Sequence, residues 1–304
     1  MNVIATLPLR VNFKKQIVDS MAIDEIRINT INPLAKPPKE TLEQVMALCP
    51  DKKIWIDLKC RQLRIDQFSH VPSDFVLLNH KIKVPTPTPI HFDDHNVGEI
   101  ASIVDGNKLI LAYSPHKIVG KGQPVNILNP SLEIEGFFVP TDLEYIQAAK
   151  ELGIHNYLLS FVEKGEDIDA LLALDPEANI IAKIESKRGL DFVMKEYGRY
   201  SQRVKLMAAR DDLYINMGNN KADIINALRL IIQMDCGAIV ASKILTSFAK
   251  SSVPDIHDMT DLEWLRSIGY RSMMLCDNVC EEYECFQRAS NYIINHVKFL
   301  KQWT

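Results

Sequence analysis

The sequence predicts an α/β protein, a (β/α)8 or TIM barrel with a small β-rich domain inserted after the third strand. Three observations support this prediction. Eight short apolar runs recur along the chain, helical patterns separate them, and a stretch rich in proline interrupts the series after the third run. A chain of 304 residues, 47% of them hydrophobic, can bury the core of such a barrel and of a small extra domain.

The eight runs are continuously apolar, which is typical of parallel strands buried on both faces. Each is expected to supply one barrel strand, so we predict that residues 1–65 and 131–304 form the barrel. In order, the runs are NVIATLP (2–8), DEIRIN (24–29), KIWIDLK (53–59), YLLSFV (157–162), NIIAKIE (179–185), VKLMAAR (204–210), AIVASKI (238–244) and SMMLCD (272–277).

Helical spacing of apolar residues is clearest in four segments, 41–49, 141–153, 221–237 and 277–303. Thr141 is expected to cap the second of these helices, because its hydroxyl can accept a hydrogen bond from an otherwise unpaired backbone N–H. The pattern at 277–303 predicts one long helix at the end of the barrel.

Residues 66–130 differ from the rest of the chain. They contain several prolines, short alternating runs, and the turn signals Asp-Gly, Gly-Asn and Gly-Lys-Gly. We therefore predict an inserted β domain. Barrel active sites lie at the carboxyl ends of the strands, so an insert after the third strand can act as a lid.

The composition argues against several classes of protein. A net charge of -4 gives no general reason to expect a nucleic acid or an anionic membrane as partner. No segment reaches the roughly 18 apolar residues of a membrane span, and the N-terminus lacks the pattern of a signal peptide. The six cysteines show no Cys-x-x-Cys spacing, so we expect reduced thiols in a soluble, cytoplasmic protein.

Polar and charged residues gather where the predicted strands end. They are Arg27, Asn29, Asp57, Lys59, Arg61, Arg64, Ser160, Lys183, Glu185, Arg210, Asp211, Asp212, Ser242 and Lys243. Lys183 and Glu185 alone could be a solvated ion pair at a strand end. Many charges that converge on one barrel mouth are costly to bury unless they bind something, which favours an active site.

The residue types in this set indicate the chemistry. Glu185 and Asp212 could place two carboxylates on one hard cation, Mg²⁺ or Mn²⁺. Lys183 and Arg27 could hold an anionic substrate beside it. Metal, lysine and arginine together provide the fixed positive charge that phosphoryl transfer or an enolate requires.

Six of these segments, in order, resemble segments of the pyruvate kinase family. RINTINP is similar to Arg-x-Asn-Phe-Ser, IDLKCRQLRI to Asp-Thr-Lys-Gly-Pro-Glu-Ile-Arg, LLSFV to Ala-Ser-Phe, IIAKIES to Ala-Lys-Ile-Glu-Asn, MAARDDL to Val-Ala-Arg-Gly-Asp-Leu, and VASKILTSF to Ala-Thr-Gln-Met-Leu-Glu-Ser-Met. In the insert, IHFDDHNVGEI resembles the family's Val-Asp-Asp-Gly hairpin and GKGQPVNI its Lys-Lys-Gly-Val-Asn turn. The resemblance covers nearly the whole sequence. Because the sequence ends after the eighth helix, we expect the family's C-terminal domain to be absent, and a monomer or homodimer in place of a tetramer.

The resemblance implies a role for each matching residue. Lys183 would stabilise the transferring phosphoryl group and the enolate, Arg27 would contact the phosphate, and Ser242 would lie near the proton transfer, where the family has threonine. Glu185 and Asp212 would bind Mg²⁺ or Mn²⁺. The other implied contacts are Ser160, Asp211 and Asp212 with the substrate, Arg64 and Lys121 with ADP or ATP when the lid closes, and Asn29 and Asp57 with potassium.

The sequence also departs from the family pattern. Cys60, Arg61 and Gln62 replace Gly-Pro-Glu, Ile31 and Leu58 replace two potassium ligands, and Asp211 replaces a glycine. These changes argue against potassium, and Arg61 could supply a fixed charge in its place. A carboxylate at 211 would repel an anion.

Three functions remain open from the sequence. The first is a pyruvate kinase-like phosphotransferase that acts on phosphoenolpyruvate or pyruvate with Mg²⁺ and ADP or ATP. The second is a Mg²⁺-dependent aldolase or lyase that works through a pyruvate-type enolate. The third is a non-catalytic pyruvate kinase-like protein.

Overall fold

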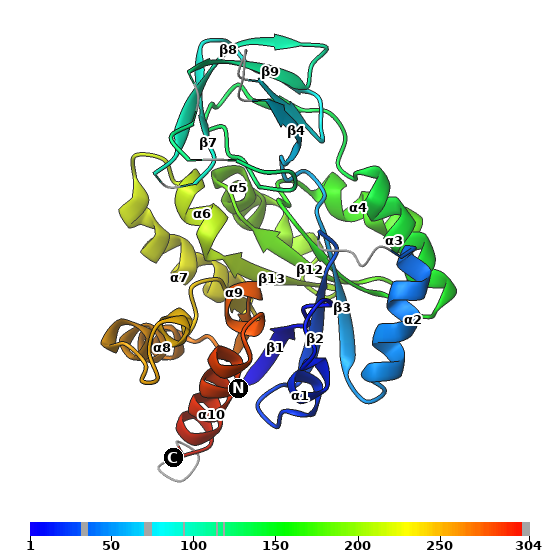
Figure 1. The fold of residues 1–304 in the computed structure, drawn as a ribbon, viewed down its shortest axis with the longest axis vertical. Coiled ribbons are helices and arrows are strands. Elements are labelled where there is room, and N and C mark those ends of the chain that lie inside the picture. Colours follow the sequence, from blue (N-terminus) through cyan, green and yellow to red (C-terminus); the bar gives the residue numbers. More distant parts are fainter. Residues whose placement is uncertain (32–35, 70–74, 94, 114, 118, 300–304) are drawn as a thin grey trace.

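The computed structural model describes residues 1–31, 36–69, 75–93, 95–113, 115–117 and 119–299. Eight parallel strands close into a barrel in the order β1-β15-β14-β13-β12-β11-β3-β2 (Figure 1). The strands are β1 (Asn2–Thr6), β2 (Glu25–Asn29), β3 (Lys53–Leu58), β11 (Asn156–Leu159), β12 (Asn179–Ile184), β13 (Val204–Ala209), β14 (Ile239–Ala241) and β15 (Ser272–Leu275). Each predicted apolar run supplies one strand, so the (β/α)8 barrel is confirmed.

Helices follow the strands and cover the outside of the barrel (Figure 1). They are α1 (Lys14–Asp19), α2 (Pro38–Leu48), α3 (Pro140–Glu151), α4 (Gly165–Leu174), α5 (Lys187–Lys195), α6 (Arg210–Asn216), α7 (Ile224–Met234), α8 (Ile256–Ile268), α9 (Asp277–Cys280) and α10 (Tyr283–Phe299), with 3₁₀ turns η1 (Tyr197–Arg199), η2 (Lys221–Asp223) and η3 (Thr246–Ala249). Among these described helices, none is both long and apolar enough to cross a membrane.

Two helix predictions were wrong in detail. The segment 277–303 is not one helix, because α9 and α10 are separate. Val279 and Cys280 in α9 are buried, and so are Cys285 and Phe286 in α10. The exposed residues Glu281 and Glu282 form a bend between the two helices. The predicted end at 300–303 lies outside the described residues.

The start of α3 also differs from the prediction. Pro140 is the first helical residue and Val139 the N-cap, in place of Thr141. Proline suits this position because its fixed φ matches the helix and its missing N–H is not needed there. The buried carboxylate of Asp142 accepts the N–H of Val139 (3.2 Å) and those of Lys59 and Cys60 (both 2.8 Å), which ties the end of β3 to α3.

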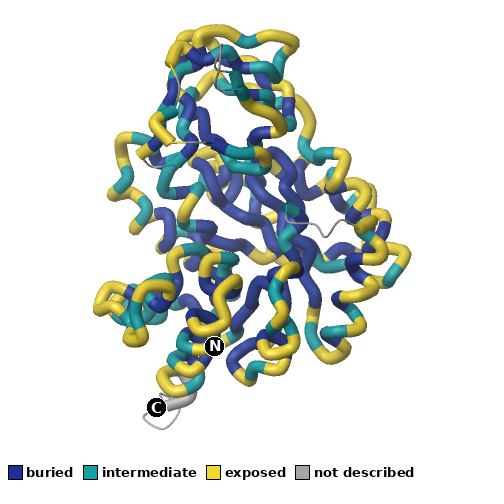
Figure 2. Tube along the Cα trace, in the orientation of Figure 1, coloured by how far each residue is buried: buried dark blue, intermediate teal, exposed yellow. Residues whose placement is uncertain are grey.

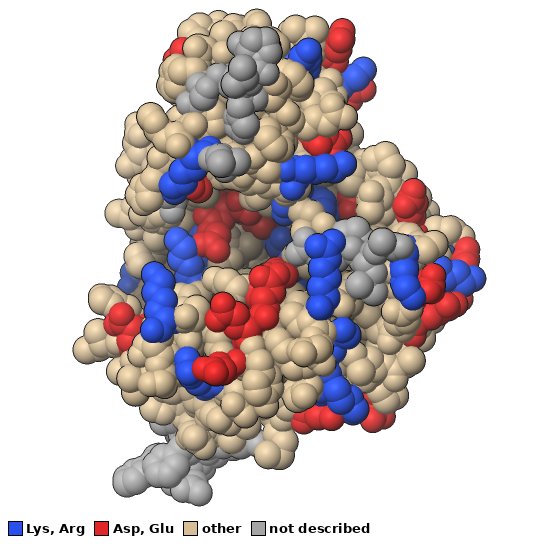
Figure 3. Space-filling view, in the orientation of Figure 1, with Lys and Arg blue, Asp and Glu red and all other residues tan. Residues whose placement is uncertain are grey.

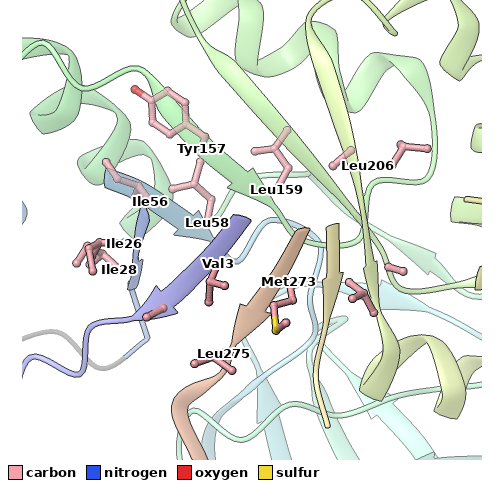
Figure 4. Packing of buried hydrophobic residues seen from close by; sticks show 14 of the residues in the cluster. Val3, Ile26, Ile28, Ile56, Leu58, Tyr157, Leu159, Leu206, Met273 and Leu275 are labelled. Carbon is pink, nitrogen blue, oxygen red and sulfur yellow. The ribbon is translucent and has the colours of Figure 1, made fainter. Parts of the chain in front are cut away.

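The core has two layers because side chains alternate along each strand. Inside the barrel, Ile4, Trp55 and Leu158 pack together with residues of the other strands. Outside it, side chains such as Leu58 and Leu159, which are register partners on β3 and β11, pack under the helices (Figure 4). Figure 2 shows the resulting buried centre inside an exposed outer surface.

The insert after β3 is a β domain, as predicted, and its strands are antiparallel. Its main sheet has the order β4-β5-β9-β8-β7, and a second pair joins β6 to β10. The strands are β4 (Ile65–Ser69), β5 (Phe75–Leu78), β6 (Ile82–Lys83), β7 (Thr88–His91), β8 (Val97–Val104), β9 (Lys108–Tyr113) and β10 (Glu133–Ile134). The insert has its own apolar core, which includes Val76, Ile90 and Ile100. It stands over one end of the barrel (Figure 1). The boundaries at 65/66 and 130/131 remain a prediction.

Candidate active site

Lys183, on β12, lies at the centre of the barrel mouth. Its ammonium is 2.9 Å from Ser160 Oγ, 3.1 Å from Glu185 Oε1 and 3.5 Å from Asp57 Oδ1. All four residues are buried. Burial alone would lower the pKa of Lys183, but the Asp57 and Glu185 carboxylates raise it above its ordinary value. The lysine is therefore a fixed positive charge in a site with little water.

The chain around Glu185 holds its carboxylate in place. Residues 183 and 185 are two apart and point into the mouth together. Helix α5 begins directly after them, with Ser186 as its N-cap bonded to the N–H of Gly189 (3.1 Å). A Cβ at Gly189 would lie 2.9 Å from the carbonyl oxygen of Val162, so only glycine lets α5 start this close to the neighbouring segment.

Two carboxylates of the mouth, the buried Glu185 and the half-buried Asp212, interact electrostatically. Glu185 accepts the N–H of Phe161 (2.8 Å), and Asp212 accepts amide hydrogens of Gln62 (3.0 Å) and Asn126 (3.3 Å). Burial raises the pKa of both, and the Asp212 charge raises that of Glu185 further.

Such carboxylates fit a hard divalent cation, because bound positive charge would relieve the cost of one buried and one half-buried anion. Among the described residues, three or more His, Cys, Asp or Glu side chains do not come together as a metal site. A Mg²⁺ ion held by one or two carboxylates takes its other ligands from substrate and water.

Asp57 is surrounded by cations. Its Oδ2 accepts hydrogen bonds from Arg27, with Nε at 2.8 Å, and lies 3.3 Å from Lys59 Nζ. Burial would raise the pKa of Asp57, but Lys183, Lys59 and Arg27 depress it far below its ordinary range. The pKa of Lys59 is lowered to about 7, mainly by burial. Asp57 raises this pKa, while the neighbouring cations lower it further.

The predicted potassium pair does not fit this arrangement. Asn29 turns to Asp277, where its Nδ2 donates to Oδ2 over 3.1 Å, while Asp57 is held by the cations. Leu58 is fully buried and offers no side-chain oxygen. The proposal that Arg61 replaces the ion is wrong, because its guanidinium bonds Asp167 (2.8 Å to Oδ2) under helix α4. The cations beside Asp57 are Arg27, Lys59 and Lys183.

The insert closes on the barrel through polar contacts. Arg64 donates to the Gly122 carbonyl (2.6 Å) and to Gln62 Oε1 (3.0 Å), and burial lowers its pKa to about 10. Asn126 of the insert reaches Asp212, as described above. Lys121 is exposed on the same turn as Gly122. Figure 3 shows a hollow under the insert with acidic side chains in its depth and basic ones around it.

Ser242 and Asp211 lie at the edge of the mouth. Ser242 follows β14 with a positive φ of 72°. Asp211 is exposed and lies 3.4 Å from Lys243 Nζ. The Asp211 carboxylate is therefore paired with a cation, which weakens the repulsion of an anion that the sequence suggested.

Three polar residues of the site were missed from the sequence. Gln62 and Asn126 hold Asp212, and Asp277 bonds Arg27 Nη1 over 2.7 Å. Asp277 is the last residue of the predicted run 272–277, so the rule that placed the other strand-end charges in the mouth could have found it. No local signal marks Gln62 or Asn126, since their partner is distant in sequence.

Comparison with known proteins finds a similarity to a pyruvate kinase. No family model matches the sequence. Pyruvate kinase of Thermoplasma acidophilum is 27% identical over 271 residues, which cover 82% of this chain and 48% of that protein. The chain thus spans about half the length of the curated relative it matches. This identity, together with the closed parallel barrel and its insert after β3, makes the chain a distant homologue of pyruvate kinase.

Proposed function

We propose that the protein is a pyruvate kinase-like phosphotransferase, which converts phosphoenolpyruvate and ADP to pyruvate and ATP, or the reverse, with Mg²⁺. The observation that carries the proposal is the buried ammonium of Lys183 beside Ser160, Glu185 and Asp57. A fixed cation of this kind stabilises negative charge that develops on a transferring phosphoryl group and on an enolate oxygen.

The side chains around Lys183 have distinct tasks in this proposal. Ser160 donates to the Leu58 carbonyl (2.8 Å) and accepts from Lys183, so it holds the lysine in position. Arg27 contacts the substrate phosphate, and its bonds to Asp57 and Asp277 keep its guanidinium in the mouth. The hydroxyl of Ser242 takes part in proton transfer at the carbon that becomes the methyl group of pyruvate.

Glu185 and Asp212 would hold Mg²⁺, which supplies positive charge to the substrate oxygens when it is bound. The protein prepares these two carboxylates through other residues. The N–H of Phe161 orients Glu185, while the amides of Gln62 and Asn126 orient Asp212. Because Asn126 belongs to the insert, closure of the insert would complete the environment of Asp212.

We assign the nucleotide to the side of the mouth below the turn that contains Gly122. Arg64 already lies against this turn, and Lys121 is next to it in sequence. Their charges would meet the phosphates of ADP or ATP. Burial lowers the pKa of Arg64 to about 10, which leaves the guanidinium charged at neutral pH.

The decisive experiment measures ATP formed from phosphoenolpyruvate and ADP in the presence of Mg²⁺. We expect ATP formation that depends on the metal and on both substrates. Lys195→Ala should retain this activity, because Lys195 is exposed and makes only a surface pair with Asp191. Absence of ATP with a folded protein that binds the metal would contradict the proposal.

A second function, enolate chemistry without a nucleotide, is favoured by a different observation. A hollow of about 290 Å³ beside Asn29 is lined by the acids Asp277 and Glu281 as well as by Arg10. Its carboxylates disfavour an anion there, so this hollow would suit an uncharged second substrate such as an aldehyde. Exchange of the methyl protons of pyruvate in D₂O with Mg²⁺, together with no turnover of ADP, would select this alternative.

The rate of ATP formation is expected to be insensitive to potassium. Arg27, Lys59 and Lys183 already surround Asp57, and a further cation there would be repelled. Replacement of K⁺ by tetramethylammonium at constant ionic strength should change the rate by no more than about twofold. Strong activation by K⁺ in the wild-type protein would show that Asp57 is open to the ion.

A further inference from the structure

We propose that Arg210 is a positioning residue for Ser242. The guanidinium of Arg210 holds the strained segment after β14 in the conformation that the reaction requires. This inference rests on the role proposed for Ser242 in proton transfer. Arg210 itself does not need to touch the substrate.

The segment after β14 adopts an unusual backbone conformation. Ser242, Lys243 and Leu245 have φ values of 72°, 54° and 55°. L-residues other than glycine rarely adopt positive φ, and a β-branched or bulky side chain makes it less favourable still. Such residues persist where their surroundings hold them, and they are frequent at active sites. Some contact must therefore stabilise this segment.

Arg210 provides that contact. Its Nη2 donates to the carbonyl of Ser242 (2.8 Å) and to that of Lys243 (3.2 Å), and its Nε also donates to Ser242 O (3.1 Å). Its Nη1 donates to Asp261 of α8 over 2.7 Å. The planar fork thus joins two strained residues to a helix outside the barrel, and a lysine cannot make the same set of bonds.

The position of Arg210 in the chain gives these bonds a consequence for the site. It is the first residue of α6, two residues before Asp212. The start of one helix thus carries both the carboxylate proposed for the metal and the guanidinium that holds the backbone of Ser242. The spacing between Asp212 and the backbone of Ser242 is therefore set by a short piece of the protein.

A cavity makes the proposal testable by chemical rescue. Arg210 and Asp261 line a cavity of about 630 Å³, to which Tyr214, Lys243 and Trp264 also contribute. In Arg210→Ala a free guanidinium ion could enter through this cavity and occupy the place of the missing side chain between the carbonyls and Asp261.

The first measurement is the exchange of pyruvate methyl protons in D₂O with Mn²⁺. Arg210→Ala and Arg210→Lys should lose at least about tenfold in exchange rate, while the dissociation constants for Mn²⁺ and oxalate stay within about twofold. Guanidinium should restore exchange in Arg210→Ala and leave Lys183→Ala inactive. Unchanged exchange in Arg210→Ala, or a parallel loss of exchange and oxalate binding, would overturn the proposal.

The second measurement is amide hydrogen exchange of residues 242–248, which needs no activity. Arg210→Ala should speed it by at least about tenfold. Arg188→Ala is the matched control, because Arg188 also donates to two carbonyls, those of Pro130 and Leu132, far from this segment. Unchanged amide hydrogen exchange in Arg210→Ala would refute the proposed role of Arg210. If the wild-type protein does not exchange the methyl protons of pyruvate, the proposed function fails. Amide hydrogen exchange of residues 242–248 still decides whether Arg210 holds this segment.

Discussion

Lys183→Met is expected to lower the rate of ATP formation from phosphoenolpyruvate and ADP by at least about 10³-fold. Methionine fills a similar volume but removes the ammonium that lies 3.1 Å from Glu185 and 3.5 Å from Asp57. The charge that develops on the substrate would then lose its nearest fixed cation. A coupled assay of ATP at saturating Mg²⁺ measures the loss directly.

The same substitution should also destabilise the protein, by about 3 kcal/mol, because a buried carboxylate loses its partner. Asp57 keeps Arg27 and Lys59, so Glu185 bears most of this cost. Lys195→Met is the control for loss of a lysine at an exposed site. A Lys183→Met protein that retains a tenth or more of the wild-type rate would exclude Lys183 from the proposed role.

Binding of Mn²⁺ to the substrate-free protein is expected to tighten as the pH rises, with release of protons. Burial raises the pKa of Glu185 and of Asp212 above their ordinary values. A raised pKa means that the charged carboxyl destabilises the folded state, and this penalty develops as the pH rises from about 4 through the raised pKa. The metal requires the charged forms, so its affinity should increase over this range, by up to about tenfold per pH unit for each proton released.

Calorimetry between about pH 5 and pH 8 in buffers of different ionisation enthalpy would count the protons. Asp212→Asn should abolish the metal response, while Asp211→Asn, which changes an exposed carboxyl paired with Lys243, should retain it. The contribution of Asp57 to stability depends on pH in the opposite direction. Its depressed pKa stabilises the fold above about pH 4, and that contribution is lost as the pH falls further. Mn²⁺ binding that Asp212→Asn leaves unchanged would show that Asp212 is not a ligand.

Much of this fold can be predicted from the sequence because parallel barrel strands are buried on both faces. Runs such as 179–185 therefore stand out without any knowledge of their neighbours. Charges placed directly after such runs, Lys183 and Glu185 among them, meet at one end of the barrel by geometry alone. The exact starts and ends were less predictable. The bend between α9 and α10 depends on which apolar residues the rest of the core accepts.

Contacts between distant segments could not be derived from sequence spacing. Asn126 reaches Asp212 across the interface between insert and barrel, and Arg27 joins Asp57 to Asp277 across the mouth. Arg61 is an example of a contact that the sequence wrongly suggested. It stands among the strand-end charges in the sequence, yet its bond to Asp167 turns it away from the centre. Which of several nearby partners a long side chain selects depends on three-dimensional packing.

The imidazole of His80 joins the two places where the chain crosses between barrel and insert. Its Nε2 lies 2.7 Å from the carbonyl oxygen of Cys60, on the outgoing chain, and its Nδ1 lies 3.1 Å from that of Glu135, on the returning chain. Two crossings pinned to one small ring cannot twist or slide past each other independently. The ring therefore ties the outgoing and the returning chain together at the base of the insert, so that any swing of the insert over the barrel mouth would have to move both crossings together.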